Sequence, residues 1–67
     1  MRADIARLRT LERELEQMRR KYERMVPEQP ALYDPMQIAV VSIAGAASEC
    51  KRAADYLELA IRKEVGG

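Results

Sequence analysis

The sequence predicts an all-α fold: an antiparallel two-helix hairpin, similar to a coiled coil, that fills residues 1–67 as one domain. Two stretches carry apolar residues at alternating spacings of three and four, the pattern of helices that each bury one stripe. A connection with two prolines separates these stretches. A chain of 67 residues rarely builds a sufficient core alone, and a second subunit commonly supplies the remainder. We therefore expect the hairpin to assemble as a homodimeric four-helix bundle.

The first predicted helix covers residues 2–25. Its positions outside the apolar stripe are nearly all charged or polar, as expected for a wet face. Pro27 cannot extend the helix without losing a hydrogen bond, so the helix should stop near Met25. The stripe consists of Leu8, Leu11, Leu15, Met18, Tyr22 and Met25, and Met1 and Ile5 extend it.

The predicted connection covers residues 26–34. Pro27 and Pro30 make it stiff rather than freely flexible. Leu32 and Tyr33 lie near its end, where they either pack across the end of the helix pair or offer a contact to a partner at an exposed tip.

Four local signals agree on the start of the second predicted helix. Asp34 suits the N-cap, Pro35 suits the first helical position, and Gln37 can close a capping box. Tyr33 and Ile38 occupy the two positions of a hydrophobic staple.

The second predicted helix covers residues 35–65 and carries its own apolar stripe. In an antiparallel hairpin the two stripes face each other in one constant register, which pairs Tyr22 with Val40 and Leu15 with Ala47. Large side chains of the first helix thus face small ones of the second, as interdigitated packing requires. The second stripe consists of Met36, Val40, Ile43, Ala47, Cys50, Ala54, Leu57 and Ile61.

The second helix carries more apolar surface than one neighbouring helix can cover. No charged residue occurs from Pro35 to Ser48, and a seam of small residues runs beside the stripe. Glycine inside a helix costs about 1 kcal/mol relative to alanine, so Gly45 indicates close approach of another helix. We expect that helix to come from a second copy or from a different protein. The predicted interface consists of Ala39, Ser42, Gly45, Ala46, Ala53 and Tyr56.

The residue types exclude most site chemistry. Cys50 is the single cysteine and the chain has no histidine, so neither an internal disulfide nor a zinc site of the usual ligands is expected. Glu12, Glu14 and Glu16 fit a solvated helix face rather than an acid–base pair, and Cys50 fits a packed apolar position. We expect no cofactor, no metal and no enzymatic activity.

Charge and hydropathy limit the partners. Twelve basic and eleven acidic residues give a net charge of +1, which does not favour a polyanion. No apolar run approaches the ~18 residues of a membrane span, and no segment is patterned as a signal peptide. We expect a soluble, cytoplasmic protein without membrane contact.

Four arginines share one outer face of the first helix: Arg9, Arg13, Arg20 and Arg24. This face is typical of a solvated surface or of a contact with an acidic protein. It also suits a nucleic-acid contact, but Glu16 and Glu23 interrupt it and no aromatic residue lies among the arginines to stack on a base.

The run Leu32-Tyr33-Asp34-Pro35-Met36-Gln37, followed by a helix of small and aliphatic residues, resembles the corresponding junction in small co-chaperones of type III secretion needle subunits. Those proteins build helical hairpins of about this size. The resemblance implies that this chain pairs with a larger helical-repeat chaperone and keeps an aggregation-prone subunit soluble.

The sequence therefore predicts a small non-catalytic protein-binding module, such as an adaptor, co-chaperone or inhibitor, that acts through packing of its second helix. Two alternatives stay open: a phage or mobile-element regulator of a host protein, and a hairpin dimer that binds nucleic acid through the basic face. Self-association and binding of a different protein are equally compatible with the apolar face, and a small ligand between subunits stays open too.

Overall fold

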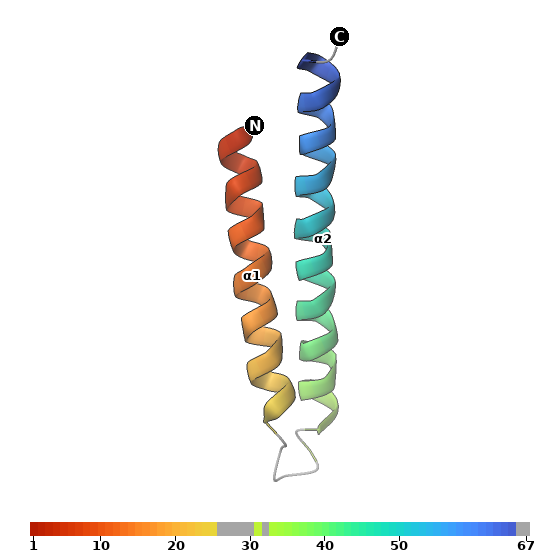
Figure 1. Ribbon diagram of the computed structural model, residues 1–67. Helices are drawn as coiled ribbons and strands as arrows, with labels where there is room; N and C mark the ends of the chain where they lie inside the picture. Colours follow the sequence, from red (N-terminus) through yellow and green to blue (C-terminus); the bar gives the residue numbers. More distant parts are fainter. Residues whose placement is uncertain (26–30, 32, 66–67) are drawn as a thin grey trace.

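Figure 1 shows two long helices that lie side by side and run in opposite directions. The structure, a computed structural model, describes residues 1–25, 31 and 33–65. Helix α1 spans Arg2–Arg24 and helix α2 spans Tyr33–Val65, and these described ranges contain no strand. The predicted all-α antiparallel hairpin is confirmed.

The hairpin is a thin rod with extents of 57 × 15 × 12 Å. Helix α2 has 33 residues and α1 has 23, so the C-terminal turns of α2 extend beyond the N-terminus of α1 (Figure 1). Among the described residues, each helix packs only against the other, so their remaining faces carry no further contact from this part of the chain.

Helix α1 ends one residue earlier than predicted. Met25 is its C-cap, with an extended backbone (φ −81°, ψ 109°), and its N–H donates to the carbonyl oxygen of Tyr22 at 3.2 Å. The backbone thus leaves the helix two residues before Pro27. Most of the predicted connection, residues 26–30 and 32, lies outside the described residues.

Helix α2 begins at Tyr33, two residues earlier than predicted. Asp34 lies in its first turn rather than at the N-cap, where its carboxylate still faces the positive end of the helix dipole. Pro35 is also accommodated there, because the first turn has no partner for its missing N–H. Tyr33 and Ile38 are both more than half exposed, so the predicted staple buries little of either side chain.

The inner face of α2 follows its predicted stripe. Ala47 and Ala54 are almost completely buried, and the other six members of the stripe are half-buried. The facing pair Tyr22 and Val40 lines one hollow at the closed end of the rod, together with Met25 and Met36, as the predicted register requires.

The inner face of α1 differs from its predicted stripe. Met1, Met18 and Met25 are exposed, so their prediction as buried members is wrong. Four charged residues are half-buried in their place: Arg9, Glu12, Glu16 and Arg19. Helix α1 is turned toward this charged flank because the alkyl stems of long charged side chains can cover the alanines of α2 while their ends stay solvated.

The core within one chain is small. Among the described residues only Ile5, Ala47 and Ala54 are buried, and no large side chain is fully enclosed. The chain has an accessible surface of 5463 Å², whereas a compact monomer of 7.7 kDa exposes about 4,300 Å². One hairpin therefore leaves much apolar area in contact with water.

Candidate protein-binding surfaces

One long side of the rod is charged, and Arg9 connects the two helices along it. The Arg9 Nη2 group donates to Asp55 Oδ1 and to Glu58 Oε1, both at 2.8 Å. These hydrogen bonds raise the pKa of Arg9 above its ordinary value, the bond to Glu58 contributing most. The Arg9 side chain is 32% exposed, so the bridge lies at the edge of the helix contact.

A second group of charges on this side lies within α1. Arg19 Nη1 donates to Glu23 at 2.7 Å, and Arg19 Nη2 donates to Glu16 at 2.9 Å. The hydrogen bond from Arg19 lowers the pKa of Glu16. Helical spacings of three and four bring these side chains together, and the pairs satisfy the charge of the half-buried guanidinium.

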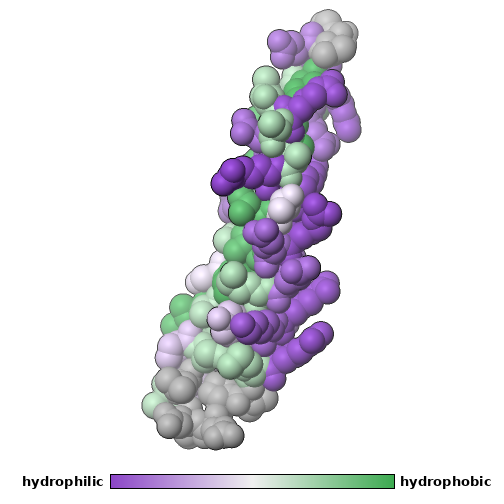
Figure 2. Space-filling view, turned by 90° about the vertical axis from the view of Figure 1, so that its left-hand side faces the viewer, coloured by the Kyte–Doolittle hydropathy of each residue, from purple (hydrophilic) through white to green (hydrophobic). Residues whose placement is uncertain are grey.

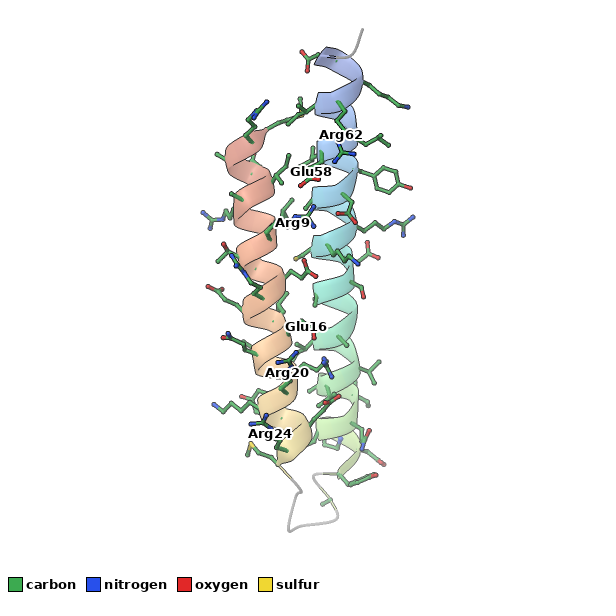
Figure 3. The ribbon with its side chains drawn as sticks, in the orientation of Figure 1. Arg9, Glu16, Arg20, Arg24, Glu58 and Arg62 are labelled. Atoms are coloured by element: carbon green, nitrogen blue, oxygen red, sulfur yellow. The ribbon has the colours of Figure 1, made fainter. Side chains whose placement is uncertain are left out.

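Arg9 differs from the other three arginines of the predicted basic face because its side chain is bonded to α2. Figure 3 shows Arg9 between the helices near Glu58, to which it donates. Arg13, Arg20 and Arg24 are exposed on α1, as the sequence pattern suggests.

The opposite long side is apolar. Leu11 is two residues from Arg9, and Ala53 is two residues from Asp55; two residues correspond to a turn of about 200° in an α-helix. Because Arg9 and Asp55 meet on the charged side, Leu11 and Ala53 lie at one height on the other side. Figure 2 shows this division most clearly in the lower half of the rod, where hydrophilic residues lie along one edge and apolar residues along the other.

Two further layers follow at intervals of seven residues, which return to nearly the same side of a helix. Met18 and Ala46 form the next layer, and Met25 and Ala39 form the third. In all three layers α1 contributes a large apolar residue and α2 an alanine. We call this surface the apolar side; it consists of Leu11, Met18, Met25, Ala39, Ala46 and Ala53. Leu11 is half-buried and the other five are exposed.

The predicted interface residues are all exposed: Ala39, Ser42, Gly45, Ala46, Ala53 and Tyr56. Helical spacing places Ser42 next to the alanines of the apolar side, whereas Gly45 and Tyr56 lie farther round the helix, facing away from α1. A Cβ atom added at Gly45 would meet nothing within 4 Å. The hairpin itself therefore gives no close approach at this glycine.

The outer face of α2, opposite α1, holds large apolar residues that the predicted interface leaves out. Ile38 is 67% exposed and Val41 is 68% exposed, and Leu59 is exposed on the same face. The uncharged run from Pro35 to Ser48 contains the first two, so this run was the signal that could have identified them.

The predicted tip contact lies beside the hollow at the closed end, which has a volume of ≈ 390 Å³. Tyr33 lines this hollow and is more than half exposed. Leu32, the other predicted tip residue, lies outside the described residues.

Within the described residues, no three His, Cys, Asp or Glu side chains gather in a way that could hold a metal ion. Neither helix has a stretch long and apolar enough to cross a membrane, as far as the described residues go. Comparisons of the chain with protein-family models, curated proteins and solved structures find no match.

Proposed function

We propose that this chain is a non-catalytic protein-binding module that acts by packing its helices against other helices, and that it self-associates as a dimeric four-helix bundle. The observation that carries the proposal is the imbalance between core and surface. Three described residues are buried, while eight large apolar side chains are exposed. Exposed apolar surface on this scale marks an interaction site.

The arrangement of this surface supports helices as the partners. The apolar side runs along both helices at heptad spacing, as in the seams of helical bundles. Its alanines let another helix approach closely, and the methionines of α1 can adapt to a neighbouring surface. Four of the six predicted interface residues lie on this side or next to it, namely Ala39, Ser42, Ala46 and Ala53. Gly45 and Tyr56 lie on the outer face of α2.

Several biological roles share this mechanism. A co-chaperone would cover an apolar helix of its client, and an inhibitor, including a phage or mobile-element regulator, would cover a helix of its target. Nucleic-acid binding is the weaker alternative, because Arg9 and Arg19 are engaged with carboxylates and leave Arg13, Arg20 and Arg24 for phosphate contacts.

The mass of the purified chain tests the proposal. We expect light scattering to give twice the mass of one chain at micromolar concentrations, with a fully helical circular dichroism spectrum. A well-folded monomer at every concentration would contradict self-association. A poorly folded monomer that becomes helical when a second protein is added would indicate that the apolar side binds that protein instead of a second copy.

A further inference from the structure

We propose that a second copy of the hairpin docks on the apolar side in antiparallel orientation, about a twofold axis that passes through the layer of Met18 and Ala46. This inference rests on the self-association proposed above. It specifies which surface the dimer buries and how the two hairpins are oriented relative to each other.

The heptad layers match themselves under this axis. Leu11 and Met25 lie seven residues on either side of Met18, and the axis therefore brings Leu11 to the height of the partner's Met25. On α2, the same axis brings Ala39 to the height of the partner's Ala53. Each of the three layers of one copy thus meets one of the three layers of the other.

The side chains suit the neighbours that this axis gives them. The two α2 helices meet along alanines. Because these side chains are small, the two helix axes can approach closely. The two α1 helices meet along leucine and methionine, whose flexible side chains fill the wider gap between them. Small side chains therefore lie between the two α2 helices and large ones between the two α1 helices, and together they fill the core of the bundle.

Charged residues beside the apolar side favour the antiparallel direction. Glu14 and Lys21 are exposed on the same edge of α1, and neither makes an ion pair with another described residue. Lys21 lies over the ring of Tyr22, with its Nζ 5.6 Å from the ring centroid. The twofold axis places Glu14 beside the partner's Lys21, and this attraction occurs twice in the dimer.

The opposite orientation lacks this match. An axis along the rod would bring both closed ends together and set α1 against the α2 helix of the second copy. Glu14 would then lie at the height of the partner's Glu49, and two like-charged pairs would oppose association. The alanine layers alone accept either orientation, so the charges decide between them.

The available area is sufficient for a stable dimer. The chain exposes 5463 Å², which is about 1,100 Å² more than a compact monomer of this mass. Each partner of a standard interface buries roughly 800 Å². A second copy can therefore cover the excess without displacing α1 from α2.

Charge reversal tests the orientation. We expect Glu14→Lys to weaken the dimer roughly tenfold, measured as the dissociation constant by sedimentation, because two attractive pairs become repulsive. The double variant Glu14→Lys with Lys21→Glu should restore the original constant. Circular dichroism should be unchanged in both variants, since neither side chain takes part in the helix contact.

A distance measurement gives an independent test. A spin label at Arg62→Cys, in a Cys50→Ala background, lies about 24 Å along the rod from the proposed axis at 1.5 Å per residue. Pulsed electron resonance should give a distance between labels of about 48 Å in the antiparallel dimer, and below about 30 Å with the axis along the rod.

The outcomes separate the two proposals. A long label distance with weakening by Glu14→Lys is the expected result. A short distance, or a tighter dimer on Glu14→Lys, would overturn the antiparallel orientation while self-association remained. A monomeric mass with no distance between labels would overturn both.

Discussion

At the scale of single residues, Arg9 links the charged flanks of the two helices. Its guanidinium joins Asp55 and Glu58 of α2. Met18 and Met25 lie on the opposite flank of α1 and are exposed.

Replacing Arg9 tests this contact. Arg9→Met keeps the alkyl stem and removes both hydrogen bonds, so the midpoint of thermal unfolding should fall, and the fall should be smaller at high salt. Asp55→Asn should have little additional effect in the Arg9→Met background, because its partner is already lost. Arg13→Met is the matched control. An equal effect of Arg9→Met and Arg13→Met would contradict the bridge.

Glu16 should contribute a part of the pH dependence of stability. Its pKa is lowered in the folded chain, chiefly by the hydrogen bond from Arg19. The folded state therefore favours the carboxylate, and this stabilisation is present above the unfolded pKa and is lost as the pH falls through the folded pKa. Glu16→Gln should flatten the decline in stability below about pH 5, as measured by denaturant unfolding. Glu64→Gln, far along the rod, should leave that decline unchanged.

At the scale of secondary structure, α2 has two roles on different faces. Its inner stripe packs on α1, while its alanine seam and outer face remain exposed. Helix α1 is amphipathic in the usual sense, but its inner face includes stems of charged side chains. Helix α1 therefore contributes fewer apolar side chains to the contact between the helices than its predicted stripe suggests.

Leu15→Ala measures the strength of the hairpin contact. Leu15 is half-buried and pairs with Ala47 in the predicted register. We expect a loss of about 2 kcal/mol in the free energy of unfolding, at the low end for such truncations, because the site is only partly enclosed. Ser48→Ala, on an exposed face, is the control. Equal denaturant midpoints for Leu15→Ala and the unmodified chain would contradict the register.

Gly45→Ala tests whether another helix covers the outer face of α2. A Cβ atom at this position meets nothing within 4 Å, so the substitution should raise the free energy of unfolding by about 1 kcal/mol through helix propensity. Dimer mass should stay unchanged, because Gly45 points away from the proposed twofold contact. A loss of stability or assembly would instead indicate that another helix approaches this glycine closely.

At the scale of the whole molecule, the rod has a high ratio of surface to core. The small buried core and the accessible surface of 5463 Å² make an isolated hairpin marginal. If the proposed dimer forms, its stability should therefore come largely from contacts between chains.

A dimer held together by contacts between chains should unfold at a temperature that depends on protein concentration. If the dimer is the folded species, mass action should raise the midpoint of thermal unfolding as the chain concentration increases. Calorimetry or circular dichroism over a hundredfold range of concentration measures this shift. A midpoint that does not change over that range would contradict a dimer that unfolds together with its dissociation.

The helices, their antiparallel pairing and the inner stripe of α2 could all be predicted from the sequence. These follow from local propensity and from the spacing of apolar residues, and both are properties of short stretches. Ala47 and Ala54 are predicted by this spacing and lie at the centre of the contact. The surplus apolar residues of α2 were also visible as an uncharged run.

The tertiary structure alone decided the rotation of α1 and the chemistry of the two long sides. In the predicted stripe Met18 and Leu15 are equivalent, because spacing does not distinguish two flanks of one helix. In the folded chain, Arg9 on one flank of α1 bonds residues about fifty positions later, while Met18 on the other flank is exposed and Leu15 is half-buried. Such contacts join side chains that only folding brings together, so spacing within one helix does not reveal them.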